Sequence, residues 1–239
     1  MCDTCGCGDP ELVSVPVHER ILATNHRVAR HNREHFRDAG VLAINLMGSP
    51  GSGKTALLEA TARALGGSHR IGVLVGDLAT DHDAQRARAA GVVAEAITTG
   101  SACHLDAEMV HHGLHHLPWR ELEYLFIENV GNLVCPAVYD LGEEFNVVAL
   151  SVTEGEDKPV KYPTMFRKAD LVLLTKVDLL PYLPGISVDK IRAHLAEVMP
   201  NPLMLPISAV SGEGLPAWLS WLQERAHHRQ HTRAVVVGH

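Results

Sequence analysis

Seven short apolar runs recur along the chain from residue 41 onward, and stretches long enough to form helices separate them. These runs cover residues 41–47, 71–76, 92–97, 124–129, 147–152, 171–176 and 203–208. Strands that are apolar along their whole length and alternate with helices are typical of a parallel sheet covered on both faces. The pattern therefore predicts a three-layer α/β fold with a mainly parallel central sheet, in which ligands bind at the carboxyl ends of the strands.

The two ends of the chain follow other patterns. Residues 17–39 place spaced apolar positions among many charges, and Gly40 can stop the amphipathic helix that this pattern predicts. Residues 1–16 show no periodicity and are expected to form a mobile tail, and residues 227–239 are expected to be a frayed end. We therefore expect one folded domain at residues 17–226 between two flexible ends.

The composition narrows the classes of function. The 239 residues carry a net charge of −7 with neutral histidine and contain no long basic run, which argues against nucleic acid as a partner. No apolar run approaches the roughly 18–20 residues that a membrane-spanning helix needs. The first residues lack the basic and apolar regions of a signal peptide. The protein is therefore expected to be cytoplasmic, with no membrane and no nucleic acid as a partner.

The first apolar run leads directly into GSPGSGKT at residues 48–55, which has the form G-x-x-x-x-G-K-S/T of a P-loop. In such a loop, backbone N–H groups converge on phosphate oxygens, Lys54 reaches the β- and γ-phosphates, and the Thr55 hydroxyl can hold Mg²⁺. The helix that follows adds the positive end of its dipole. The predicted nucleotide-binding residues of this segment are Gly48, Ser49, Gly51, Ser52, Gly53, Lys54, Thr55 and Ala56.

Two acids that end apolar runs are candidates for holding Mg²⁺ or the attacking water. Glu128 ends one run, with Gly131 three residues later as a hinge near the γ-phosphate, and Asp77 follows another. An acid at the end of a buried strand can hold Mg²⁺ directly or through water. The alternative for both acids is helix capping or a place in a solvated loop. The predicted catalytic residues are Lys54, Thr55, Asp77 and Glu128, of which the last three are also the predicted Mg²⁺ ligands.

Two later segments are candidates for binding the base of the nucleotide. TKVD at residues 175–178 resembles the signature in which an aspartate accepts hydrogen bonds from guanine and a lysine stem packs over the base, roles that Asp178 and Lys176 fit. Adenine lacks the 2-amino group, so its binding would leave the carboxylate unpaired. SAVSGEG at residues 208–214 resembles the loop whose backbone reads guanine O6, here near Ser208 and Ala209. GTP and GDP are therefore the expected nucleotides.

Three cysteines stand within the first seven residues, as Cys2, Cys5 and Cys7. In a reducing cytosol, clustered thiols more often bind metal or perform redox chemistry than form disulfides. Cys-x-x-Cys spacing lets two sulfurs close on one ion, and thiolates suit Ni²⁺, Zn²⁺ and Cu⁺. The sequence predicts a metal site in this tail, with a redox dithiol as the alternative.

A second metal site is predicted at Cys103, His104 and Cys135. Adjacent Cys and His can ligate one ion near the start of a helix, particularly if a second subunit contributes. Cys135 lies four residues beyond Gly131, in the loop that should respond to the γ-phosphate. We therefore expect nucleotide binding to move Cys135 and change the metal geometry. The alternative is a pair of buried packing cysteines.

Several long strings resemble the HypB family, GTPases that assist nickel insertion into [NiFe]-hydrogenase. They are C-x-x-C-G-C at the N-terminus, GSPGSGKT, CHLDAEMV, LFIENVGNLVCPA, LSVTEGEDKP and LTKVDLLPY. The resemblance implies a SIMIBI-class fold, a GTP-dependent homodimer, a nickel site in the tail, and a nickel or zinc site at Cys103, His104 and Cys135 at or near the dimer interface. It also implies two partners, a HypA-type nickel protein and the [NiFe]-hydrogenase large subunit.

The chain departs from this family in two places. Some relatives carry a long histidine-rich tract after the cysteines, whereas residues 8–40 here hold only His18, His26, His31 and His35, which argues against bulk nickel storage. The base signature begins with Thr175, where asparagine is commoner, although threonine can still brace the loop through its hydroxyl group.

These observations leave two alternatives to a GTP-hydrolysing nickel metallochaperone. One is a GTPase for another metalloenzyme, such as urease, and the other is a nickel or zinc buffer with a vestigial nucleotide site. The intact GKT and TKVD segments argue against a vestigial site. No arginine or glutamine is linked by the sequence pattern to the γ-phosphate, which predicts slow turnover, about 10⁻³ s⁻¹ for P-loop GTPases without such help.

Overall fold

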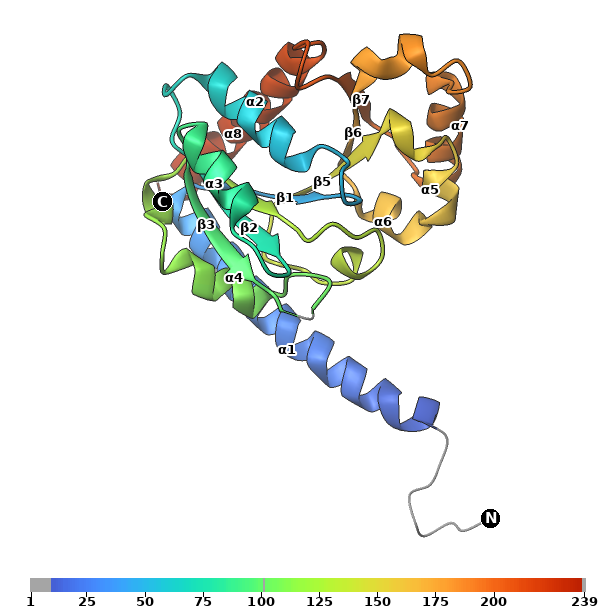
Figure 1. Cartoon of the computed structure of the whole chain (residues 1–239). Coiled ribbons are helices and arrows are strands. Elements are labelled where there is room, and N and C mark those ends of the chain that lie inside the picture. Colours follow the sequence, from blue (N-terminus) through green and yellow to red (C-terminus); the bar gives the residue numbers. More distant parts are fainter. Residues whose placement is uncertain (1–9, 101, 238–239) are drawn as a thin grey trace, which may run out of the picture.

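The computed structural model describes residues 10–100 and 102–237 and contains one parallel sheet of seven strands (Figure 1). The strands are β1 (Leu42–Met47), β2 (Ile71–Asp77), β3 (Val93–Thr98), β4 (Tyr124–Glu128), β5 (Phe145–Ser151), β6 (Leu171–Thr175) and β7 (Met204–Ile207). All seven expected strands are confirmed, and so is the α/β fold class. Their order across the sheet is β3-β2-β4-β1-β5-β6-β7, and every pairing is parallel.

Helices cover both faces of this sheet (Figure 1). One face carries α2 (Lys54–Leu65), α3 (His82–Ala89) and α8 (Leu215–Val237). The other carries α1 (Pro10–Ala39), α4 (Ala107–Leu114), α6 (Pro163–Lys168) and α7 (Val188–Val198). Short turns complete the chain as α5 (Lys158–Lys161), η1 (Trp119–Glu121), η2 (Cys135–Ala137), η3 (Val152–Glu154) and η4 (Val177–Tyr182). No helix in the described part of the chain is long and apolar enough to cross a membrane.

The alternation of side chains along β1 shows why both faces need cover. Leu42, Ile44 and Leu46 pack toward α2, α3 and α8, whereas Ala43 and Met47 pack toward the opposite helices. Successive side chains of a strand point to opposite faces, so an entirely apolar strand must be buried on both sides.

The order of the strands determines where a ligand can bind. β1 pairs with β4 on one side and with β5 on the other, so the crossovers leave β1 in opposite directions. Such a switch point opens a crevice beyond the carboxyl ends of the strands. Leu46 near the end of β1 lies opposite Glu128 in β4, and β2 ends at Asp77. The loop at residues 48–55 and both predicted acids therefore reach the same edge of the sheet.

The two ends of the chain are more helical than the sequence pattern suggests. α1 begins at Pro10, before the expected start at residue 17, and α8 continues to Val237 through most of the segment expected to be frayed. Proline is well tolerated in the first turn of a helix, because an N–H group there has no intrahelical partner. The division into one domain and two flexible ends stays a prediction, and Cys2, Cys5 and Cys7 lie outside the described residues.

Candidate functional site

The loop between β1 and α2 has a backbone conformation that depends on glycine. Gly48, Gly51 and Gly53 have φ angles of 149°, 72° and 96°. A Cβ atom on Gly48 would lie 2.4 Å from the carbonyl oxygen of Ala149, which no side chain could accommodate. The loop ends at the N-terminus of α2, where unpaired N–H groups and the helix dipole favour an anion. This part of the molecule therefore has the local structure of a phosphate-binding loop.

Lys54 is the cation of this loop. Its buried ammonium group donates hydrogen bonds to the carbonyl oxygens of Gly48 at 3.2 Å and Ser49 at 3.1 Å. Burial lowers the pKa of Lys54, and the nearby Glu128 carboxylate opposes this shift. Among the described residues the ammonium group has only neutral hydrogen-bond partners, and phosphate oxygens would be better ones.

Glu128 and Thr55 place side-chain oxygen atoms that could ligate a metal ion next to the loop. The Thr55 hydroxyl donates to Glu128 Oε1 at 2.7 Å, and Glu128 Oε2 has no hydrogen-bond partner among the described residues. Burial raises the pKa of Glu128 to about 7, against the opposing effects of Lys54 and Thr55. An unpartnered buried carboxylate oxygen beside a hydroxyl suits Mg²⁺, which prefers hard oxygen ligands. The residues present therefore fit the expected ion.

The raised pKa of Glu128 predicts a pH effect on stability in the absence of Mg²⁺ and nucleotide. A carboxyl group with a pKa of about 7 when folded and about 4.3 when unfolded stabilises the fold at low pH, and this contribution is lost as the pH rises through 7. Glu128→Gln removes the titration. Between pH 5 and pH 8 the free energy of unfolding of the parent should fall by about 2 kcal/mol more than that of the variant. Urea unfolding in the presence of a chelator measures this difference. Glu197→Gln, on the exposed surface of α7, is the control, and an equal gain there would contradict the assignment.

Asp77 lies on the wall of the same cavity, which has a volume of ≈ 420 Å³ and is also lined by Lys54, Thr55 and Glu128. Its Oδ1 accepts a hydrogen bond from the Leu78 amide at 2.6 Å, and its Oδ2 accepts one from the Thr80 hydroxyl. These bonds hold the carboxylate in place at the end of β2. The four residues predicted to be catalytic are therefore brought together around one cavity.

The base segment is attached to the phosphate loop. Thr175 donates from its hydroxyl group to the Ser52 carbonyl oxygen at 2.6 Å, so it braces the loop as expected for threonine in this position. Lys176 adopts a left-handed conformation with φ of 60°, and its ammonium group donates to the Gly51 carbonyl oxygen at 2.6 Å. Asp178 follows in η4 and is half-buried. The lysine stem thus runs back toward the phosphate loop.

The second base segment lies beside the first. β6 and β7 are paired, with Thr175 opposite Ile207, so the loops that follow them emerge side by side. The buried Ser208 hydroxyl accepts hydrogen bonds from the amides of Val210 at 3.2 Å and Ser211 at 3.0 Å, which shapes the turn around Ala209. The fold therefore brings Asp178 and the Ser208–Ala209 turn to neighbouring positions.

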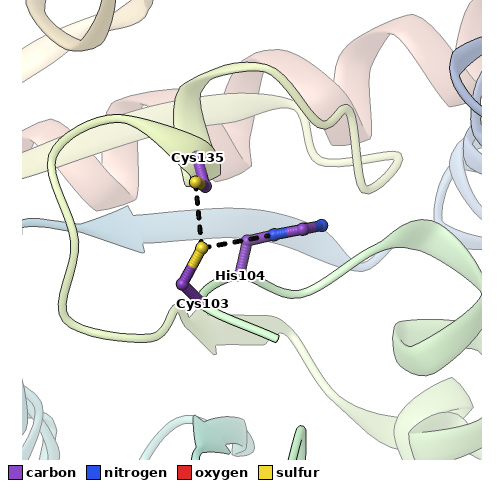
Figure 2. A group of neighbouring side chains, drawn as sticks. All are labelled: Cys103, His104 and Cys135. Carbon is purple, nitrogen blue, oxygen red and sulfur yellow. Dashed lines mark hydrogen bonds between the residues drawn. The ribbon is translucent and has the colours of Figure 1, made fainter. Parts of the chain in front are cut away.

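Cys103, His104 and Cys135 converge although 31 residues separate His104 from Cys135 (Figure 2). Their ligand atoms lie within 4.8 Å of one another, and the two sulfur atoms are 2.9 Å apart. Cys103 Sγ is 3.9 Å from His104 Nδ1. Both cysteines are only half-buried, which argues against a pair that merely fills the core. Two thiols and an imidazole are a suitable ligand set for zinc or nickel.

The surroundings of this cluster affect both kinds of ligand. The His104 ring stacks on Tyr139, with ring centroids 3.9 Å apart, and burial lowers the pKa of His104. A neutral imidazole keeps a lone pair for a metal ion. The hydrogen bond with Cys103, followed by burial, raises the pKa of Cys135, so this thiol holds its proton until a cation displaces it.

A single loop joins the metal cluster to the phosphate loop. The Asn132 amide donates to the Gly48 carbonyl oxygen at 3.1 Å, and a Cβ atom on Gly131 would lie 2.9 Å from the backbone of Pro50. The Asn132 side chain then accepts a hydrogen bond from the Val134 amide at 2.9 Å, immediately before Cys135. The predicted hinge at Gly131 is therefore in direct contact with the loop that would surround the phosphates.

Residues 42–204 match the family described as CobW/HypB/UreG, nucleotide-binding domain. The chain is 50% identical over 217 residues to the hydrogenase maturation factor HypB of Azotobacter vinelandii, an alignment that covers 91% of this chain and 71% of that protein. The chain belongs to the HypB family of hydrogenase maturation factors. This membership confirms the resemblance in the sequence motifs and places the chain among the P-loop GTPases.

Solved structures of HypB proteins share the fold. HypB from Archaeoglobus fulgidus has a TM-score of 0.80 and 42% identity, covering 86% of this chain and 100% of that one. HypB from Helicobacter pylori, solved in complex with nickel, has a TM-score of 0.82 and 38% identity, covering 86% of this chain and 96% of that one. The three-layer α/β fold, with a P-loop after its first strand, is thus the fold of the HypB family.

Two residues that line the cavity around Lys54 and Glu128 were not predicted from the sequence. Arg86 of α3 lines the cavity, with its guanidinium held by Glu59 at 2.9 Å and Asp83 at 3.3 Å. Asn129 is buried directly after Glu128, and its Oδ1 accepts a hydrogen bond from the Leu105 amide at 3.1 Å, next to His104. Arg86 stands in none of the quoted strings, and Asn129 stands in LFIENVGNLVCPA without a predicted role, so the folded arrangement is what identifies their contacts.

Proposed function

We propose that this chain hydrolyses GTP and uses the state of the nucleotide to control a nickel or zinc ion at Cys103, His104 and Cys135. Nickel is the ion destined for [NiFe]-hydrogenase. The observation that carries the proposal is the 3.1 Å hydrogen bond from the Asn132 amide to Gly48, because it ties the metal-bearing loop to the phosphate loop. A shift of either loop is transmitted to the other through this contact.

In the proposed reaction, water attacks the γ-phosphorus of GTP while the bond to the β–γ bridging oxygen breaks. GDP leaves with that oxygen, and the proton of the water ends on the phosphate released. Lys54 stabilises the charge that develops on the γ-phosphate and the leaving oxygen, and Asp77 orients the water. Thr55 and Glu128 would hold Mg²⁺, which supplies further charge neutralisation to the phosphates when bound.

The base specificity is proposed to come from Asp178, with the Lys176 stem over the ring and the Ser208–Ala209 turn at guanine O6. Asp178→Asn exchanges an acceptor for an amide donor, so GTP affinity should fall by about 10²-fold, since a hydrogen bond to a charged group is worth about 1.5–3 kcal/mol. XTP should gain affinity, because its 2-oxo group can accept from the amide. Fluorescent-nucleotide displacement measures both. Glu213→Gln, an exposed change nearby, is the control, and unchanged GTP binding by Asp178→Asn would contradict the role.

We further propose that two copies of the chain associate when GTP is bound, with the cysteine cluster at or near their contact. Cys103 and Cys135 are both only half-buried, so the cluster is accessible to a partner chain that could complete its ligands. A HypA-type nickel protein and the [NiFe]-hydrogenase large subunit are the proposed further partners. The tail cysteines Cys2, Cys5 and Cys7 are proposed as a separate nickel site.

Phosphate release from GTP, with and without nickel, tests the proposed function. Slow release that requires Mg²⁺ and that changes when nickel occupies Cys103, His104 and Cys135 supports it. Release that nickel leaves unchanged would leave a GTPase without metal control, and no release would leave a metal buffer. ATP in the same assay provides the specificity control.

A further inference from the structure

Four histidines gather where α1 crosses α4, apart from the nucleotide and cysteine sites. His31 and His35 lie one turn apart on α1, His111 lies on α4, and His115 caps the C-terminal end of α4. The two helices lie side by side on the same face of the sheet (Figure 1). Residues four apart on a helix share one face, so α1 presents a pair of imidazoles at this crossing, and His111 of α4 faces them.

The rings of three of these histidines are mutually close. The Nε2 atoms of His31 and His35 are 2.9 Å apart, and their ring centroids are 4.2 Å apart. The His111 centroid lies 5.3 Å from that of His31 and 6.1 Å from that of His35. Two imidazoles that share a tetrahedral ion at about 2.1 Å per nitrogen have centroids about 5 Å apart. The ligand nitrogens are not yet as close as the ligand atoms of the Cys103 cluster, so the His31 and His35 side chains would have to rotate toward His111 to close on one ion.

The hydrogen bonds around Asn32 determine which nitrogen of His111 is free. The fully buried Asn32 amide nitrogen donates to the carbonyl oxygens of Ala107 at 2.9 Å and Leu141 at 3.1 Å. Its Oδ1 must therefore be the acceptor in the 3.0 Å contact with His111 Nδ1, which makes Nδ1 the protonated nitrogen. The lone pair of His111 is then on Nε2. In metal-binding histidines the ring nitrogen that does not ligate commonly donates a hydrogen bond of this kind, which orients the ring.

We propose that His31, His35 and His111 bind one divalent transition-metal ion through their Nε2 atoms. Imidazole nitrogen suits zinc, nickel and copper rather than calcium or magnesium. The exposed His115 ring, 5.3 Å from His111, is within reach of the fourth position. Three protein ligands with an open or exchangeable fourth position are typical of zinc sites that act on a further ligand rather than only supporting the fold.

The chemistry around the three rings supports this site. Burial, followed by the neighbouring rings and Arg120 for His35, lowers the pKa of His35 and His111. Glu34 and Asp38 add negative charge near His35. His31 is exposed and His35 and His111 are half-buried, so an ion can enter from solvent. An ion there would fasten α1 to the helix that directly follows Cys103 and His104.

Metal binding to the full chain tests this site independently of GTP hydrolysis. Equilibrium dialysis with Zn²⁺ should give one more ion per chain in the parent than in His31→Gln, with at least a tenfold loss of affinity for that ion. His31 is the variant of choice because its exposed ring supports no buried contact. His26→Gln, another exposed histidine of α1, should bind as many ions as the parent. Equal stoichiometry and affinity in parent and His31→Gln would overturn the proposal.

Cobalt titration distinguishes this site from the cysteine sites. Co²⁺ bound to thiolates gives intense sulfur-to-metal absorption, whereas Co²⁺ bound only to imidazole gives ligand-field bands without it. His31→Gln and His111→Gln should each remove a ligand-field component and leave the thiolate absorption unchanged. Loss of both components together, or of neither, would contradict a separate histidine site. Unfolding midpoints in chelator identify any variant that fails to fold, and His35→Gln then replaces it.

Discussion

Replacing Lys54 with alanine is expected to lower the rate of GTP hydrolysis by about 10³-fold, the upper end of what one oriented donor to a developing charge contributes. The Lys54 ammonium is buried and donates hydrogen bonds to two carbonyl oxygens of the loop that would surround the phosphates. Its removal takes away a positive charge that water cannot replace inside the cavity. Single-turnover release of labelled phosphate measures the effect.

The same variant should retain metal binding by the tail and by the Cys103 cluster, because neither set of ligands includes Lys54. Arg63→Ala, an exposed cation on the same helix α2, should hydrolyse GTP at the parent rate. If Lys54→Ala lost hydrolysis and metal binding together, with an unchanged unfolding midpoint, the nucleotide and metal sites would not be separable as proposed.

Replacing Cys135 with serine is expected to weaken nickel or zinc binding at the folded domain by more than about 100-fold, since changes even in groups that only orient metal ligands cost 10–100-fold. Cys135 supplies one of two thiols whose sulfur atoms are 2.9 Å apart, and a hydroxyl group is a poor ligand for a borderline ion. Competition with a chromogenic chelator measures the affinity. The measurement requires serine at Cys2, Cys5 and Cys7, so that the tail does not bind the ion.

Tyr139→Phe is the matched control for Cys135→Ser. It keeps the ring that stacks on His104 and removes only a hydroxyl group, so metal affinity should stay within a few-fold of the parent. An affinity for nickel that survives Cys135→Ser would mean that the ion is held elsewhere, for example by the histidines of α1 and α4.

The fold could be predicted from the sequence because most of the strands are apolar on both faces. Runs such as residues 124–128 and 171–175 leave no polar side for solvent, so helices must cover the sheet, and the structure confirms all seven strands. The phosphate loop could also be predicted, because its glycines stand in a recognisable motif. Gly48 and Gly53 of that motif have φ angles that favour glycine. The extents of α1 and α8 were not, because weakly patterned polar sequence does not specify where a long helix ends.

The candidate site was predictable where local strings mark its residues, including the distant Cys135, and residues outside such predictions that act through contacts between distant segments were missed. The three predicted metal ligands converge, but nothing in the sequence links Asn129 to Leu105 or Arg86 to the phosphate cavity. The sequence pattern assigns no shared role to the histidines His31, His35 and His111 of α1 and α4. Their pairing across two helices depends on how α1 packs on α4, which the sequence pattern does not reveal.

The central claim is that the Cys103–His104–Cys135 cluster responds to the nucleotide through the loop that contacts Gly48. The most direct test is the absorption spectrum of Ni²⁺ at this cluster, in a chain with serine at Cys2, Cys5 and Cys7. The spectrum should differ between GDP and a non-hydrolysable GTP analogue, because the Asn132–Gly48 contact transmits loop closure to Cys135. Identical spectra with GDP, with the analogue and without nucleotide would contradict the coupling.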